Sequence, residues 1–153
     1  MEEKALIEAL RLAVDPPSGV DVAALQDLVR DDQTTAWDIS TTARHLGVSP
    51  HTLRYYEHIG LLTVQRDCSG HRRYDAASVR RLVFITRMRI SGMPIAVLQR
   101  YIHLADAGPD TVPERLALLL DHRNSLRLQI AQLQLSLAAT EYKISVYTEG
   151  PTP

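Results

Sequence analysis

The chain has 153 residues, enough for one domain or a small domain with helical appendages, which excludes a large multidomain enzyme. With 45% apolar and 23% charged residues, it can form a core and falls outside the disordered class. Its longest apolar run, Leu116 to Leu120, is far short of the roughly 18 residues of a membrane span, and no signal peptide is evident, so we expect a cytoplasmic protein. The single cysteine, Cys68, excludes an internal disulfide and any multi-cysteine metal site.

The net charge of −1 hides an uneven distribution along the chain. Residues 1–36 hold three basic and eight acidic side chains, a net charge of −5, whereas residues 37–108 hold ten and five, a net charge of +5. Only this middle part has the electrostatic footprint of a polyanion binder. Fifteen of the 17 basic residues are arginines, which suit bidentate phosphate and guanine contacts, although a GC-rich coding bias explains that count equally well.

The first elements expected are two short amphipathic helices over residues 3–14 and 21–30, followed by a polar linker. Helices of this length are not stable alone in water, so their apolar faces must pack on something. We hypothesise that they pack on a second apolar stripe of the long C-terminal helix, where they extend a subunit interface or gate the lobe formed by residues 37–108. An ordered decoration without a regulatory role is an equal alternative.

A helix-turn-helix is predicted next. Residues 37–39 favour a short strand, and Ser40 is expected to cap a helix over residues 41–46 that ends at a glycine. Ser49 then caps a second helix that opens with proline and reaches a second glycine, over residues 50–60. Two helices joined by a glycine-containing turn are typical of this DNA-binding motif.

A β-hairpin, or wing, should follow the second helix. Residues 61–66 and 71–74 favour extended structure, and the Asp-Cys-Ser-Gly sequence between them is typical of a turn. The predicted hairpin brings Arg72 and Arg73 onto its returning strand.

Three helices are predicted beyond the wing: one capped by Asp75 that reaches about residue 91, one over residues 94–107, and a long one over residues 111–147. Ten positions of the long helix recur at alternate steps of three and four, as in a coiled-coil seam: Leu116, Leu119, Arg123, Leu126, Ile130, Leu133, Leu137, Thr140, Ile144 and Tyr147. We expect the seven aliphatic members to form a dimer interface. A second apolar stripe lies beside the seam: Leu120, Leu128, Ala131, Leu135, Ala138 and Val146.

The recognition-helix sequence points to a family. Thr52 to Glu57 reads Thr-Leu-Arg-Tyr-Tyr-Glu, Gly60-Leu61 follows, and Arg73-Tyr74 stands after the turn. This combination strongly resembles the MerR family of bacterial transcription regulators. The resemblance covers residues 37–147 and leaves residues 1–36 outside the usual family pattern. It implies a mainly α fold with a winged helix-turn-helix lobe followed by a long dimerisation helix that forms an antiparallel coiled coil.

The resemblance also implies the function. Members of the family are homodimers that bind a pseudo-palindromic promoter operator and distort the DNA so that RNA polymerase can engage the promoter. Such distortion costs a few kcal/mol and must be matched by protein contacts. The implied regions are an acidic extension (1–36), a DNA-binding domain (37–108), a dimerisation helix (109–148) and a tail (149–153).

Carried onto this chain, the resemblance gives nine DNA-binding candidates: Ser49, His51, Thr52, Arg54, Tyr55 and Tyr56 on the second helix, and Arg72, Arg73 and Tyr74 in the wing. Arg54 is the best candidate for a base or phosphate contact. Adjacent residues point about 100° apart on a helix, so we expect one of the two helix tyrosines to contact a phosphate while the other packs in the core. The alternative for Tyr74 is that it closes the small core.

The resemblance to this family names no effector. The chain looks like a short form without a separate C-terminal effector domain, lacks the cysteines of metal-sensing and redox-sensing relatives, and carries Arg87 where aldehyde-responsive relatives have a cysteine. Cys68 could be oxidised in the wing, but an incidental exposed cysteine is the better interpretation. His103, Asp106 and His122 could be imagined as a metal set, yet scattered solvated residues explain them better. We predict no cofactor, although a small apolar effector could still bind.

Two other classes of protein are alternatives to a regulator. An enzyme is disfavoured because the sequence has no phosphate-binding glycine loop, nucleophile elbow or His-Glu metal motif. A protein–protein or architectural module that uses only the coiled coil is the remaining alternative. Replacement of Arg54 separates that module from a DNA-binding regulator.

Overall fold

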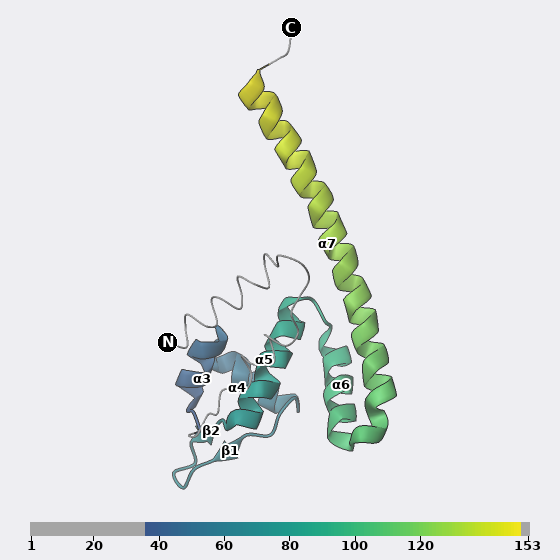
Figure 1. Ribbon diagram of the computed structural model, residues 1–153. Coiled ribbons are helices and arrows are strands. Elements are labelled where there is room, and N and C mark those ends of the chain that lie inside the picture. Colours follow the sequence, from purple (N-terminus) through teal and green to yellow (C-terminus); the bar gives the residue numbers. More distant parts are fainter. Residues whose placement is uncertain (1–35, 151–153) are drawn as a thin grey trace. The chain divides into compact units, whose positions relative to one another are not determined.

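The structure is a computed structural model that describes residues 36–150 (Figure 1). It is mainly helical with one two-stranded sheet, as predicted. The chain divides into two compact units, the first ending at Met88 and the second beginning at Arg89. The two helices predicted within residues 1–36, and the packing suggested for them, lie outside the described residues.

The first described helix begins earlier than predicted. Helix α3 spans Ile39–Leu46, and its N-cap is Asp38 rather than Ser40. The Asp38 carboxylate accepts a hydrogen bond of 2.7 Å from the backbone N–H of Thr41, which satisfies one of the free donors of the first turn. The strand expected over residues 37–39 is reduced to a single bridge, in which the backbones of Trp37 and Tyr74 exchange hydrogen bonds of 2.9 and 2.8 Å.

The turn between the two helices of the motif forms as predicted. Gly47 adopts a left-handed φ of 66° and ends α3, while the backbone N–H of Val48 reaches back to the carbonyl of Ala43. Ser49 caps helix α4, which spans Pro50–His58, by accepting a hydrogen bond of 3.1 Å from the N–H of Thr52. Helix α4 stops short of the predicted Gly60, which follows in a left-handed conformation.

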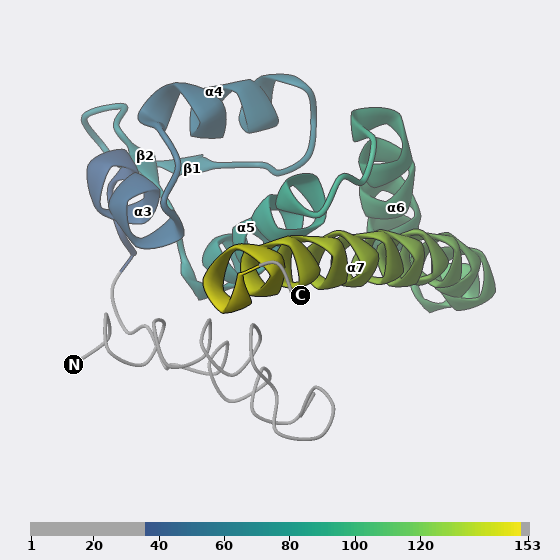
Figure 2. The ribbon, with the colours of Figure 1, turned by 90° about the horizontal axis from the view of Figure 1, so that it is seen from above.

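The wing is present but shorter than predicted. Strands β1 (Gln65–Arg66) and β2 (Arg72–Arg73) pair antiparallel, with Gln65 opposite Arg73 and Arg66 opposite Arg72. The preceding residues Leu61, Leu62 and Val64 are buried instead of paired in the sheet. Their side chains pack in the core, so only residues 65–66 and 72–73 form backbone pairs of the sheet. Figure 2 shows the two helices and the hairpin of this unit together.

Helix α5 (Ala76–Ile90) completes the first unit and continues to the start of the second. Asp75 begins it as predicted, because its carboxylate accepts a hydrogen bond of 2.8 Å from the N–H of Ser78. Side chains from α3, α4, α5 and the segments beside the strands form the core of its described part. The buried residues there are Thr42, Ala43, Leu53, Tyr56, Leu61, Leu62, Val64, Tyr74, Leu82, Ile85 and Thr86.

The second unit consists of helix α6 (Ile95–Ala107), a 3-10 turn (Pro109–Thr111) and helix α7 (Val112–Glu149). The predicted breaks are observed, since Gly92 and Gly108 have left-handed φ angles of 92° and 113°. Helix α6 packs against the first part of α7, as Figure 1 shows. The buried residues of this unit are Met93, Leu98, Ile102 and His122.

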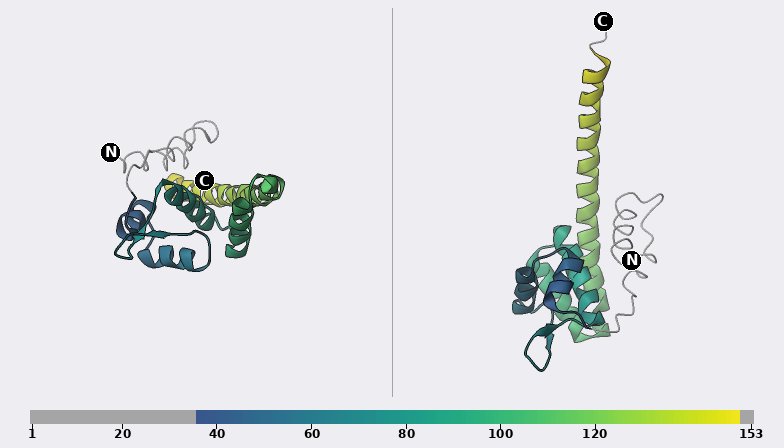
Figure 3. Two further views of the ribbon diagram at one scale, coloured as in Figure 1. Left: turned by 90° about the horizontal axis from the view of Figure 1, so that it is seen from below. Right: turned by 90° about the vertical axis from the view of Figure 1, so that its left-hand side faces the viewer.

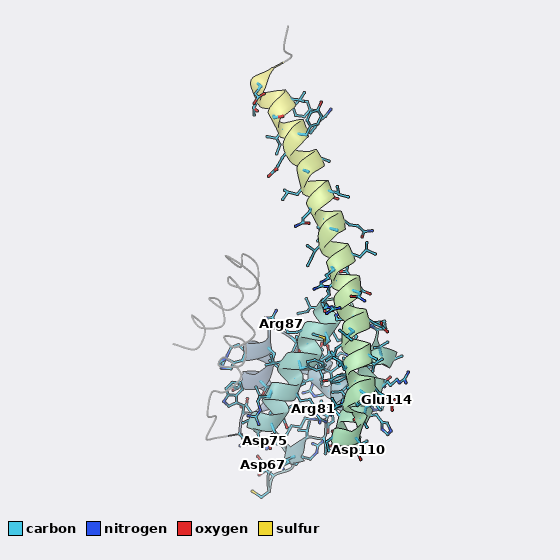
Figure 4. The ribbon with its side chains drawn as sticks, turned by 45° about the vertical axis from the view of Figure 1, so that its right-hand side comes forward. Asp67, Asp75, Arg81, Arg87, Asp110 and Glu114 are labelled. Carbon is cyan, nitrogen blue, oxygen red and sulfur yellow. The ribbon has the colours of Figure 1, made fainter. Side chains whose placement is uncertain are left out.

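Most of helix α7 is exposed in the described part of the chain. Every residue from 127 to 149 is exposed except Ser145, which is half-buried. The side chains along this part project into open space in Figure 4. Among the described residues, no helix combines the length and the hydropathy that crossing a membrane requires.

Candidate nucleic-acid interface

Helix α4 divides into a buried face and a polar outward face. Leu53 and Tyr56 point into the core, and the four predicted contact residues on the other side are solvent-accessible in the free chain. His51, Arg54 and Tyr55 are exposed, and Thr52 is half-buried. Ser49 is also exposed, but its hydroxyl already caps the helix. A helix with this polarity can enter a major groove without disturbing the core behind it.

The two adjacent tyrosines have different environments. Tyr56 is 6% exposed, whereas Tyr55 is 44% exposed. Their rings lie 6.2 Å apart at an angle of 45°. The prediction that one of the pair packs in the core is therefore confirmed for Tyr56, which leaves Tyr55 as the residue whose hydroxyl can reach a phosphate.

Arg54 contributes an uncompensated positive charge to the interface. Within the described part of the chain, no carboxylate lies within ion-pair distance of its guanidinium. It lines a hollow of about 380 Å³ where the start of α3, helix α4 and the wing meet. We call this feature the cationic hollow, and its lining residues are Asp38, Ile39, Ser40, Arg54, Arg66, Gly70, His71, Arg72 and Arg73.

Glu57 connects the recognition helix to both strands of the wing. Its Oε2 accepts a hydrogen bond of 2.5 Å from Nε of Arg72, and its Oε1 lies 3.5 Å from a guanidinium nitrogen of Arg66. The Arg72 and Glu57 side chains are 25% and 22% exposed, so water screens this pair only in part. Glu57 thereby fixes the wing relative to α4. The sequence motif contains Glu57, but nothing in its spacing showed that it would pair with the wing arginines.

Asp67 organises the turn of the wing. Its carboxylate accepts hydrogen bonds of 3.0 Å from the backbone N–H of His71 and 2.9 Å from that of Ser69, and it pairs with Nε of Arg73 at 3.2 Å. The hydrogen bond from His71 is the largest cause that lowers the pKa of Asp67 below its ordinary value. Arg66 adds a hydrogen bond of 3.1 Å to the carbonyl of Gly70. The hairpin tip, where Figure 4 labels Asp67, is thus preorganised in the free protein; Figure 3 shows how it projects.

The structure corrects the expectation that Tyr74 grips a phosphate. Its side chain is fully buried, and burial raises the pKa of its hydroxyl. Its backbone meanwhile pairs with Trp37, so the residue joins the end of the wing to the start of α3. The alternative given from the sequence, that Tyr74 closes the small core, is the observed one. Successive side chains of a strand point to opposite faces, so Tyr74 faces the core where Arg73 faces solvent. The sequence motif alone does not show which of the two faces each residue takes.

His103, Asp106 and His122 all lie within the described residues. No group of three or more histidine, cysteine or carboxylate side chains between residues 36 and 150 is arranged to hold a metal ion. His122 instead is buried, with its Nε2 2.7 Å from the hydroxyl of Ser91. Cys68 is exposed in the wing turn.

Comparison with known proteins identifies the family. Residues 38–104 match the MerR HTH family regulatory protein and residues 79–139 match the MerR DNA-binding family. A helix-turn-helix transcriptional regulator of Haemophilus influenzae is 34% identical over 109 residues, which cover 71% of this chain and 81% of the relative. The regulator AdhR of Bacillus subtilis is 39% identical over 90 residues, 58% of this chain and 64% of the relative.

The structural comparison agrees with these matches. HiNmlR, described as a MerR family regulator that lacks the sensor domain and is bound to promoter DNA in its crystal structure, superposes with a TM-score of 0.68 and 31% identity. The match covers 74% of this chain and 91% of that chain. The fold and the interface therefore define a winged helix-turn-helix DNA-binding regulator. The chain belongs to the MerR family of transcriptional regulators.

Proposed function

We propose that this regulator acts as a homodimer that binds a pseudo-palindromic promoter operator and controls transcription by distorting it. Each subunit inserts α4 into a major groove and lays the wing along the flanking phosphates. Residues 37–108 read the DNA and residues 109–148 form the dimer. Two features carry this proposal: α7 exposes an apolar seam, and the recognition helix exposes Arg54, which has no carboxylate partner among residues 36–150.

The seam supplies the argument for a dimer. Leu116, Ile130, Leu133, Leu137 and Ile144 are between 52% and 69% exposed in the single chain. Covering an aliphatic side chain of this size is worth about 1.5–3 kcal/mol when burial is complete. The first part of α7 packs on α6, whereas the aliphatic side chains of residues 127–149 are left for a partner to cover. A second copy offers the same seven aliphatic residues in the same spacing.

The DNA contacts fall to seven of the nine predicted residues. Arg54, His51 and Tyr55 are on the exposed face of α4, and Arg73 is on the exposed face of the wing. The full set is Ser49, His51, Thr52, Arg54, Tyr55, Arg72 and Arg73. Arginine is the residue that most often reads guanine in the major groove, so Arg54 is assigned the specific contact.

We infer distortion of the operator from membership of the MerR family, many members of which bend and untwist their promoters. Bending a site of 20–30 base pairs costs of the order of 1–6 kcal/mol, which the recognition helices and wings must together repay. Glu57 and Asp67 hold the wing in one conformation, so its phosphate contacts cost less conformational entropy on binding. The distorted promoter is then presented to RNA polymerase, the second partner we propose.

The experiment that tests the proposal is genome-wide footprinting of the full-length protein combined with sedimentation equilibrium. We expect protected sites within promoters, two half-sites related by a two-fold axis, and a molecular mass of two chains. Cleavage reagents that report groove width should show distortion at the centre of the site. A monomer in solution, or protected sites without internal symmetry, would contradict the proposal.

A further inference from the structure

The apolar seam of α7 is symmetric about its own midpoint, which lies between residues 131 and 132. Its ten positions are separated by alternating steps of three and four residues, and the order of the steps is the same from either end. A two-fold axis through the midpoint, perpendicular to two antiparallel helices, therefore places every seam position of one chain opposite a seam position of the other. Leu126, for example, then lies opposite Leu137 of the partner subunit.

The two polar members of the seam follow the same symmetry. Arg123 is the third position from the N-terminal end of the seam, and Thr140 is the third from its C-terminal end. The symmetric antiparallel arrangement thus places Arg123 opposite Thr140 of the partner subunit. A shift by one heptad in either direction would place Arg123 against Leu133 or Tyr147 of the partner subunit and leave the charge without a polar neighbour in its layer. A parallel pair would place two copies of Arg123 against each other.

Arg123 and Glu141 are opposite charges without an ion-pair partner in the described part of their own chain. Both side chains are exposed, and the guanidinium of Arg123 donates a hydrogen bond of 3.4 Å to the amide oxygen of Asn124. Between residues 36 and 150, neither charge has an opposite charge within ion-pair distance. Eighteen residues separate the two, about 27 Å along a helix, so they can meet only between two chains.

The symmetric antiparallel arrangement brings these two charges together. Every second seam position, beginning with Leu116, lies along one edge of the seam, and Arg123 and Leu137 belong to this edge. Glu141 follows Leu137 by four residues and flanks the same edge. A two-fold axis perpendicular to the helices aligns this edge with its own copy. Glu141 of the partner subunit then differs in height from Arg123 by one residue, about 1.5 Å, which an arginine side chain easily covers.

We propose that Arg123 and Glu141 of the partner subunit form an ion pair, present twice in the dimer, that fixes the antiparallel register and selects a second copy of this chain as the partner. This inference rests on the proposed function, in which α7 forms the dimer. The leucines around the pair exclude water, so the pair is worth more than an isolated surface pair. A helix from another regulator without a carboxylate at the matching position would leave Arg123 covered and unpaired, which disfavours mixed dimers.

Charge reversal tests the pair in the full-length protein. Arg123→Glu and Glu141→Arg each turn both ion pairs into like-charged contacts, so the dimer dissociation constant should rise by about 20- to 200-fold. The two changes shift the net charge in opposite directions, so net charge cannot account for a loss in both. The double variant restores opposite charges and should dissociate within about fivefold of the natural chain. Sedimentation equilibrium measures all four proteins.

Asp121→Arg is a matched control for Glu141→Arg. Asp121 is exposed on the face of α7 opposite the seam, and the change of charge is the same. This control should dimerise within about twofold of the natural chain. Circular dichroism checks the helix in every variant. The double variant carries both replacements, so any loss of fold caused by either new side chain would also appear there.

A mixture of the two single variants supplies a readout that a general loss of stability would not produce. The Arg123→Glu chain and the Glu141→Arg chain each have repelling contacts in their own homodimer, whereas the mixed dimer has two contacts between opposite charges. Native mass spectrometry should find more than about four-fifths of the dimers mixed, against about half for random pairing.

Cysteine cross-linking tests the register directly, in chains that also carry Cys68→Ser. Leu126→Cys and Leu137→Cys are introduced into separate chains, because these two positions face each other in the proposed register and in neither heptad shift. Oxidation of the mixture should join the two kinds of chain by a disulfide. Neither chain alone should cross-link.

Three results would overturn the inference. Equal dissociation constants for the natural chain and both single variants would mean that the pair does not form, although a dimer on a symmetric operator would leave the proposed function standing. Losses in both single variants without recovery in the double variant would mean that the two residues act separately. Cross-linking of the Leu126→Cys chain with itself would show parallel helices. A natural chain that stays monomeric would instead contradict the proposed function.

Discussion

The winged lobe and the distal half of α7 expose opposite chemistry. The lobe buries its apolar side chains, including Leu53, Tyr56 and Tyr74, and presents arginines to solvent. Residues 127–149 of α7 expose leucine and isoleucine instead and have no core.

A single chain can therefore form the core of the lobe but cannot bury the apolar side chains of the distal helix. In the lobe, Glu57 and Asp67 hold the wing arginines in place before any DNA binds. The apolar side chains of the distal helix can be buried only by an apolar partner. Changes in the helix should therefore act on assembly, and changes in the lobe should act on DNA contacts or on local stability.

The largest effect is expected from charge in the seam. Leu133→Asp combined with Leu137→Asp places carboxylates where the dimer interface should be, so dimer affinity should fall by more than about a thousandfold. Operator binding should fall at least about a hundredfold, since two linked lobes bind far more tightly than one. Sedimentation velocity and anisotropy measure the two quantities.

A matched control for the seam is available on the same helix. Leu128→Asp combined with Leu135→Asp changes two leucines that are 61% and 73% exposed but lie outside the seam. This variant should remain a dimer and bind the operator. Dissociation of the control but not of the seam variant would move the interface to the second apolar stripe.

The next largest effect is expected at Arg54. Arg54→Ala should weaken operator binding by about 1–3 kcal/mol, that is about 5- to 150-fold, without changing the thermal midpoint. Arg54→Lys keeps the charge but loses the planar fork, so binding to random duplex should persist while preference for the operator falls. Unchanged operator affinity in Arg54→Ala would favour the protein–protein module considered from the sequence.

Glu57 tests whether the preorganised wing matters. Glu57→Gln removes the carboxylate that holds Arg66 and Arg72, so the free energy of unfolding should fall by about 1 kcal/mol. Urea denaturation measures that change, and amide exchange in residues 65–73 should become faster. If wing exchange stayed the same, the hairpin would be held by its backbone and core contacts alone.

Acid should act on the same lobe more gently. The pKa values of Asp38, Asp67 and Asp75 are each lowered, first of all by a backbone hydrogen bond. A lowered folded-state pKa contributes stability above the unfolded value of about 3.9 that is lost as the pH falls through the folded value. The unfolding free energy should thus decline below about pH 4. Asp67→Asn should flatten that decline in urea titrations at several pH values.

The smallest effect is expected from the exposed tyrosine. Tyr55→Phe removes one hydroxyl and with it one phosphate contact, so operator affinity should fall by about two- to fivefold. The same change at the buried Tyr56 should leave DNA affinity unaltered. Anisotropy on both variants makes the comparison, and equal losses would show that burial does not separate the two roles.

Local signals in the sequence determined the elements of this fold. Ser49 with Pro50, Gly47, Asp75 and Gly108 mark helix ends whose geometry depends on nearby backbone groups, and all four ends were predicted. The Arg-Tyr-Tyr-Glu motif and the seam of α7 likewise depend on short spacings. Capping and periodicity are interactions within a few residues, so a reader of the chain can find them.

Only the tertiary structure decided which of two nearby residues caps a helix, which tyrosines are buried, and which arginines pair with Glu57. Asp38 caps α3 in place of Ser40 because the bridge from Trp37 to Tyr74 fixes where the helix starts. Tyr56 and Tyr74 are buried, and Glu57 meets arginines up to 15 residues away, because the wing folds back onto α4. Such choices depend on contacts between distant segments, and a local pattern carries no information about those contacts.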